Sequence, residues 1–168
     1  ALRDELDRLV GNEPRLRIAE AGGVIATCAD AYRLARGDLV AVLNVDDELA
    51  PDALVELLTR LETEPAADVV YSDEDVIMGD GRRDDPLFKP DWSPDLLLSM
   101  NYLERFGLLR KRIVEEVGGF APDAGLGQSY DLMLRVSEKT DRIAHVPKVL
   151  YHVRGHQTTL DTVLARGY

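Results

Sequence analysis

The sequence predicts an α/β fold built on a mixed, mainly parallel sheet with helices on its faces. Short apolar runs alternate with stretches in which apolar residues recur every three or four positions, the pattern of alternating strands and helices. Residues 39–43 are continuously apolar, as expected of a strand buried on both faces. Because no repeat or linker divides the 168 residues, we expect a single domain.

The first part of the chain is expected to contain two helices and a strand before the apolar run. Residues 2–10 place apolar side chains at helical spacing, and residues 15–19 are typical of a short strand. Gly22 and Gly23 mark a turn. A helix is then predicted over residues 24–36.

The middle of the chain is expected to form a helix, a strand and a hairpin. Pro51 is suited to open a helix that runs to about residue 62. Its apolar face is predicted from four leucines at helical spacing: Leu54, Leu57, Leu58 and Leu61. Residues 68–71 are typical of a short strand, and Asp80-Gly81 favours a hairpin in the loop-rich segment that follows.

The last part of the chain is expected to be helical before it ends in a strand. The predicted elements are helices at 94–100, 111–117 and 130–139 and a strand at 143–154 that Pro147 interrupts. Gly118 and Gly119 are suited to end the second of these helices.

Composition excludes several classes of protein. Lys and Arg number 20 and Asp and Glu 31, a formal net charge of −11, which argues against nucleic acid as a partner but suits a divalent cation. Cys28 is the only cysteine, so a disulfide framework and a cysteine-based zinc site are excluded. No apolar run approaches the roughly 20 residues of a membrane-spanning helix.

Two acidic segments directly follow predicted strands. They are Asn44-Val45-Asp46-Asp47 and Ser72-Asp73-Glu74-Asp75. If the strands are parallel neighbours, both segments lie at the edge of the sheet where ligands bind in open α/β folds. Metal binding and helix capping explain the first segment equally well, and a solvated turn explains the second when it is taken alone. Together they favour a binding site.

Three other features have structural explanations that the residues alone favour. Trp92 could form a wall against which a sugar ring packs, or it could plug the core under a long loop. Its place in a Pro-rich loop favours the second interpretation. Ser129 is suited to cap the helix in whose first turn Asp131 lies, although a polar site there is the alternative. His152 is suited to bind a metal, but a single histidine on a strand is more often structural.

Taken in order, these segments resemble family 2 glycosyltransferases, and most closely the bacterial subgroup that builds cell-surface polysaccharides. The resemblance covers nearly the whole chain. It rests on Gly22-Gly23-Val24, residues 37–43, residues 46–54, residues 71–75, residues 88–97, Asn101-Tyr102, residues 117–120, residues 130–135 and residues 145–154. It implies a partial GT-A (Rossmann-like) fold and transfer of a sugar from a nucleotide-diphosphate donor to a polysaccharide or lipid-linked acceptor with inversion.

The resemblance also implies roles for particular residues. The Asp-x-Asp motif falls on residues 44–46, so Asp46 is expected to bind Mn²⁺ or Mg²⁺, with Asn44 a weaker ligand and His152 assisting. The pair that contains the general base falls on Gln128 and Ser129. Residues expected to line the donor and acceptor cleft are Asp73, Glu74, Asp75, Trp92 and Gln128.

Several departures from the family pattern define the alternatives. Asn44 lacks the charge of aspartate, and Ser129 cannot act as a general base near neutral pH. Asp131 is a weak substitute, because it points elsewhere in relatives. A non-catalytic module that binds sugar or protein is therefore the second hypothesis. A dinucleotide-binding oxidoreductase is a weak third, since the Gly-x-Gly-x-x-Gly spacing is absent.

The strand–helix–strand unit that binds the nucleotide base in the family is expected before Ala1. Without that unit, an open sheet edge would favour oligomer formation or pairing with a missing N-terminal segment. The resemblance further implies a cytoplasmic enzyme that associates peripherally with the inner face of the membrane.

Overall fold

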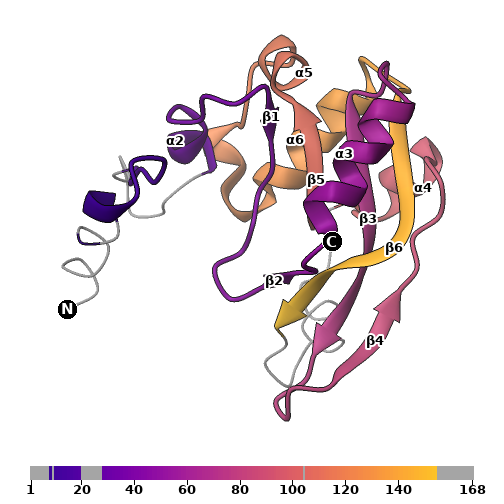
Figure 1. Ribbon diagram of the computed structural model, residues 1–168. Helices are drawn as coiled ribbons and strands as arrows, with labels where there is room; N and C mark the ends of the chain where they lie inside the picture. Colours follow the sequence, from indigo (N-terminus) through magenta and orange to yellow (C-terminus); the bar gives the residue numbers. More distant parts are fainter. Residues whose placement is uncertain (1–7, 9, 20–27, 104, 155–168) are drawn as a thin grey trace.

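The computed structural model describes residues 8, 10–19, 28–103 and 105–154 (Figure 1). The described strands form one six-stranded sheet in the order β1-β5-β3-β6-β2, and β4 pairs with the free part of β3. The strands are β1 (Leu39–Val40), β2 (Glu48–Leu49), β3 (Val69–Ile77), β4 (Arg83–Leu87), β5 (Gly107–Arg110) and β6 (Ile143–Arg154). The helices are α2 (Cys28–Tyr32), α3 (Ala53–Thr63), α4 (Pro94–Ser99), α5 (Lys111–Glu116) and α6 (Gln128–Ser137), with a 3₁₀ segment η1 (Pro122–Gly127).

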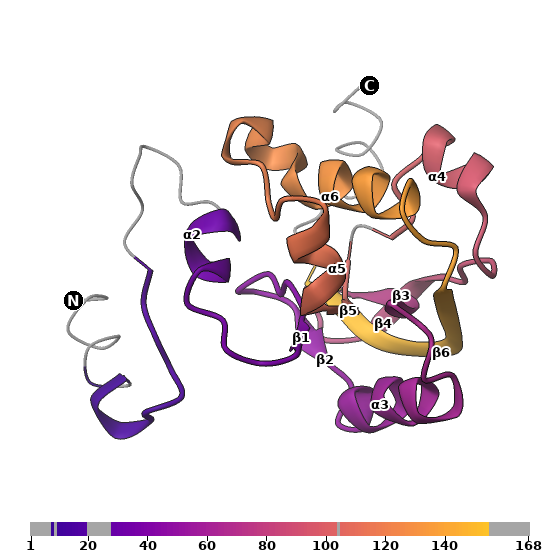
Figure 2. The same ribbon diagram turned by 90° about the horizontal axis from the view of Figure 1, so that it is seen from above.

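Helices cover both faces of the sheet, which confirms the predicted α/β class. Seen from above, α3 lies on one face while α5 and α6 lie on the other (Figure 2). Each face has its own core. The α3-side core includes Leu57, Phe106 and Tyr151, and the α6-side core includes Tyr71 and Val136.

The pairing of the strands differs from the prediction of a mainly parallel sheet. Among the described strands only β3 and β6 are parallel, and the other four pairings are antiparallel. The β3–β4 hairpin accounts for one antiparallel pair, and its turn contains Gly81 at a φ of 82°, as Asp80-Gly81 predicts. The alternation of helices and strands predicts the class but not the direction of each strand.

Strand β3 is longer than the sequence predicts. The expected strand ends at Tyr71, because Ser, Asp and Glu are poor strand formers. In the structure Ser72, Asp73, Glu74 and Asp75 continue the strand and pair with β6. Strand β6 is continuous where a break is predicted at Pro147, because the register shifts between Ser72 and Asp73 accommodate the proline as a bulge.

The segment before β2 contains less regular structure than predicted. Residues 15–19 form no strand. The first residues of the helix expected over 24–36 lie outside the described residues, and the described helix α2 ends at Tyr32. The run at 39–43 contributes only two paired residues, and Leu43 is half exposed rather than buried. Within the described residues β1 has only β5 as a neighbour, so its other edge is open.

The helices after this segment agree with the prediction within one or two residues. Leu57 and Leu61 of α3 are buried as expected, whereas Leu54 and Leu58 are exposed because Ala53 completes the buried face instead. Helix α5 ends at Glu116, just before Gly118 and Gly119, which have φ angles of 86° and 77° that favour glycine. None of the described helices is long and apolar enough to span a membrane.

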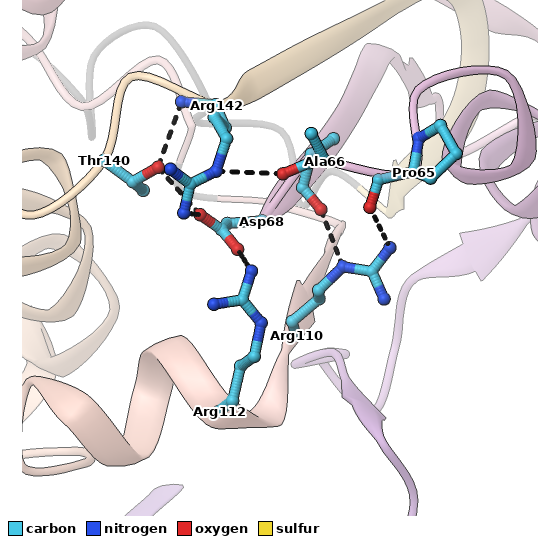
Figure 3. A network of polar contacts seen from close by, with 8 residues as sticks. Pro65, Ala66, Asp68, Arg110, Arg112, Thr140 and Arg142 are labelled. Atoms are coloured by element: carbon cyan, nitrogen blue, oxygen red, sulfur yellow. Dashed lines mark hydrogen bonds and ion pairs between the residues drawn. The ribbon is translucent and has the colours of Figure 1, made fainter.

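A buried carboxylate joins three segments of the chain at the start of β3 (Figure 3). Asp68 is fully buried and forms ion pairs with Arg112 and with Arg142, whose Nη2 lies 2.5 Å from Asp68 Oδ2. The Thr140 hydroxyl donates to the same oxygen at 2.7 Å. Beside this cluster, Arg110 donates from Nε to the carbonyl of Ala67. The cluster therefore ties β3 to α5 and to the connection between α6 and β6.

Candidate functional site

Two carboxylates of β3 lie side by side on one face of the sheet. Asp73 and Asp75 are two residues apart on the strand, so their side chains point to the same face. Both are buried, with 3% and 5% of their surface exposed. Each contacts a histidine of the parallel neighbour β6: His145 Nε2 lies 2.8 Å from Asp73 Oδ1, and His152 Nδ1 lies 2.6 Å from Asp75 Oδ1. We call these four residues the His–Asp face.

Asp73 and Asp75 each have a further hydrogen-bond donor besides the histidine. Arg83 of β4 donates from Nε to Asp75 Oδ2 at 2.8 Å. The backbone N–H of Lys89 donates to Asp73 Oδ1 at 2.9 Å. The predicted acidic segment therefore continues as a strand because partners from β4, β6 and the following loop satisfy its carboxylates.

Glu74 is separated from the His–Asp face because it points to the other face of β3. Its carboxylate lies 2.8 Å from Nζ of Lys89, whose side chain is only 1% exposed. The three acids that the sequence predicts as one substrate-binding cluster are thus divided between two environments.

The first acidic segment forms a turn beside β6. Asp47 Oδ2 accepts hydrogen bonds from the Tyr151 hydroxyl at 2.5 Å and from Asn44 Nδ2 at 2.9 Å, and Oδ1 accepts the backbone N–H of Arg154 at 3.0 Å. The Asp46 side chain is exposed and has no polar contact within the described residues. Asp47 organises the turn, and Asp46 is the carboxylate left for a ligand.

The two predicted acidic segments approach the same half of β6 from opposite sides. Glu48, which follows the turn, is paired with His152, and Asp75 is paired with His152 across the other edge of β6. Tyr151 points toward Asp47, so its neighbour His152 points to the other face of the sheet. The structure therefore brings the segments to neighbouring strands but directs Asp47 and Asp75 to different faces.

Tyr151 is expected to make the stability of the fold depend on pH in the alkaline range. Burial raises the pKa of the Tyr151 phenol above its ordinary value of 10.0, and the hydrogen bond to Asp47 raises this pKa further. The folded state therefore favours the protonated phenol, and this stabilisation is complete below pH 10 and lost as the pH rises above it. We expect the urea midpoint to fall less steeply above pH 10 in Tyr151→Phe than in the wild type; equal slopes would contradict this role.

No group of three His, Cys, Asp or Glu side chains among the described residues is arranged to hold a metal ion. The chemistry of the individual donors nevertheless suits one. Mg²⁺ is commonly bound by one or two carboxylates together with phosphate oxygens of a substrate. Asp46 offers a carboxylate. A His152 ring protonated at Nδ1 donates to Asp75 Oδ1 and leaves Nε2 for another partner. Metal binding at Asp46, Asn44 and His152 stays a prediction.

The start of α6 differs from the predicted capping arrangement. The helix begins at Gln128, its N-cap residue is Gly127, and Ser129 lies inside the first turn rather than at the cap. Gln128 is buried and donates from Nε2 to the Gly125 carbonyl at 2.8 Å. Asp131 is held by Arg135, with 2.5 Å between Asp131 Oδ2 and Arg135 Nη2. This ion pair removes Asp131 as a free carboxylate.

Trp92 lies in the segment between β4 and α4, which we call the Trp92 loop (residues 88–93). Its side chain is half-buried and packs against the α6-side core, as the plug interpretation expects. The indole N–H is buried and has no hydrogen-bond partner among the described residues. Trp92 is therefore a core contact that keeps one side accessible.

The sequence did not indicate an apolar cavity of about 550 Å³ next to β1. It is lined by Cys28, Ala31, Tyr32, Ala35, residues 39–43 and Phe120. Strand β5 separates β1 from β3, so this cavity is distinct from the His–Asp face. The sequence does not connect Arg83 and Asp91 with this site, because they contact β3 and β6 only through tertiary structure.

The sequence profile of glycosyl transferase family 2 matches residues 2–121. The chain belongs to glycosyl transferase family 2. This membership confirms the resemblance found in the sequence. A relative named O-antigen biosynthesis protein RfbC, from Myxococcus xanthus, is 38% identical over 156 residues, which cover 91% of this chain and 12% of the relative.

Solved structures confirm the fold of this family 2 chain. The structure of S. aureus TarS 1–349 in complex with UDP-GlcNAc matches with a TM-score of 0.62 at 16% identity, over 77% of this chain and 38% of that chain. The complex of the same protein with UDP matches with a TM-score of 0.60 at 17% identity, over 81% and 41%. The chain therefore spans less than half of these proteins and about an eighth of RfbC.

Proposed function

We propose that this chain is part of a glycosyltransferase that transfers a sugar from a nucleotide-diphosphate donor to a glycan or lipid-linked acceptor in bacterial polysaccharide synthesis. The observation that carries this proposal is membership of glycosyl transferase family 2 together with the 38% identity to RfbC. The complexes of TarS with UDP-GlcNAc and UDP support a nucleotide sugar as the donor. By analogy with the family, we place the enzyme at the cytoplasmic face of the membrane.

The reaction requires that the acceptor hydroxyl lose its proton and that the departing diphosphate be stabilised. Mn²⁺ or Mg²⁺, when bound, supplies positive charge for the diphosphate. Asp46 would hold this ion because its carboxylate is exposed and otherwise uncommitted within the described residues. His152 would assist through Nε2, since Asp75 engages Nδ1 and fixes the direction of the ring.

A non-catalytic, sugar-binding or protein-binding module is the second candidate. A specific observation favours it. The base position is occupied by Ser129, and the nearby Asp131 is committed to Arg135. No carboxylate in the first turn of α6 is thus free to accept a proton from a sugar hydroxyl.

Calorimetric titration with UDP, with and without Mn²⁺, tests donor binding directly. We expect wild-type binding that requires Mn²⁺ and that Asp46→Ala weakens by about tenfold or more, because loss of a ligand costs at least as much as loss of a residue that orients one. Asp52→Ala is the matched control, since Asp52 is exposed and its side chain does not cap α3.

Two results of this titration would contradict the proposal. Folded protein that binds no UDP would contradict nucleotide binding by this chain. Binding that is equal in Asp46→Ala, Asp52→Ala and the wild type would contradict the role of Asp46 while leaving the donor site in place.

A further inference from the structure

His145 contacts carboxylates through both of its ring nitrogens. Nε2 lies 2.8 Å from Asp73 Oδ1, and Nδ1 lies 3.2 Å from Asp91 Oδ1. The histidine and Asp73 are buried, whereas the Asp91 side chain is 96% exposed. A neutral imidazole has one N–H donor and one acceptor nitrogen, so it cannot donate to two ionised carboxylates at once.

The geometry indicates how many protons the two ring nitrogens of His145 carry. An exposed carboxylate is ionised in neutral solution, and therefore Asp91 can only accept from Nδ1–H. Asp73 Oδ1 also accepts the N–H of Lys89. A ring protonated on both nitrogens satisfies every contact. The titratable groups that the structure shows facing the ring are Asp73 and Tyr71 from β3 and Asp91 from the Trp92 loop.

The same ring is linked to three consecutive residues of the Trp92 loop. Residue Lys89 is held through its N–H by Asp73, which contacts His145. Pro90 is held through its carbonyl by the Tyr71 hydroxyl at 2.5 Å, and the Tyr71 ring stacks on His145 with 4.8 Å between centroids. Asp91 is held by His145 itself. Each of these three contacts therefore involves His145 or a residue that touches it.

We infer that His145 is a positioning residue whose doubly protonated ring joins Asp73 to Asp91 and so fixes the Trp92 loop against the His–Asp face. The inference rests on the proposed function only in treating this loop as one wall of the substrate site. His145 acts through Asp91, Asp73 and Tyr71. Through these residues it places Trp92 beside the His–Asp face.

Nitrogen NMR of the uniformly labelled chain at neutral pH tests the charge of the ring. The protein has three histidines, and the spectrum of His145→Gln assigns the signal of His145. We expect both ring nitrogens of His145 to carry a proton. A ring with a single N–H would overturn the inference.

Fluorescence tests the positioning role, because Trp92 is the only tryptophan of the chain. Asp91→Ala removes the acceptor of the Nδ1–H, whereas Asp91→Asn removes the same charge but keeps an oxygen that can accept this bond. We expect a red shift of the emission and stronger acrylamide quenching in Asp91→Ala, and values close to those of the wild type in Asp91→Asn. Asp141→Ala, at an exposed residue of another loop, controls for loss of a negative charge.

Identical emission and quenching in Asp91→Ala and Asp91→Asn would overturn the positioning role. The UDP titration separates this result from failure of the proposed function. A wild-type protein that binds no UDP while the NMR and fluorescence results hold contradicts donor binding alone. A protein that binds UDP with a singly protonated His145 contradicts the inference alone.

Discussion

Ser129→Asp is expected to raise the rate of sugar transfer by about 10²- to 10⁴-fold in the natural full-length polypeptide, the range that a positioned general base contributes. The resemblance places the base of family 2 at this residue, where the serine hydroxyl cannot take up a proton near neutral pH. Ser129 lies in the first turn of α6 and is half-buried. A carboxylate in the first turn of a helix is compatible with the helix dipole, so the variant is expected to fold.

Ser129→Asn is the matched control, because asparagine has nearly the shape of aspartate but is not a base. Transfer is measured as UDP released from UDP-GlcNAc in the presence of acceptor glycan, a donor chosen because TarS binds it. Equal rates in Ser129→Asp and Ser129→Asn, in protein that still binds UDP, would favour the non-catalytic module. A gain confined to Ser129→Asp would show that the rest of the machinery is intact.

Local sequence patterns predicted the elements that are stabilised mainly by local features. The leucine spacing around Leu57 predicted α3, the Asp80-Gly81 pair predicted the β3–β4 hairpin, and two glycines predicted the end of α5. These features depend on residues within a few positions of one another. Strand direction and the length of β3 depend on neighbours far along the chain, which explains why both predictions were wrong.

The candidate site shows the same division. Asp73 and Asp75 could be selected from the sequence, and their alternate spacing on an extended strand would have placed both on one face. Their partners could not be selected in the same way. His145 is 72 residues from Asp73, and His152 is 77 residues from Asp75. Only the parallel register of β3 and β6 brings them together.

The largest effect on stability is expected from removing both arginines that pair with Asp68. Arg112→Ala/Arg142→Ala is expected to lower the free energy of unfolding by roughly 3–5 kcal/mol, the usual cost of leaving a buried charge without its partner. The carboxylate is fully buried, whereas the arginine side chains are 56% and 50% exposed and lose little when they return to water. The cost therefore arises from Asp68, and each single variant is expected to lose less because one guanidinium remains.

A third substitution separates this explanation from the loss of the arginines themselves. Adding Asp68→Ala to the double variant removes the unpaired charge, so the urea midpoint is expected to recover in part even though one more native contact is lost. Arg110→Ala controls for lost guanidinium–carbonyl bonds, since Arg110 bonds the Ala67 and Pro65 carbonyls and none of the described carboxylates. A triple variant less stable than the double would contradict the buried-charge explanation, because Asp68 would then still stabilise the fold without its arginines, through contacts such as the hydrogen bond that it accepts from the Thr140 hydroxyl.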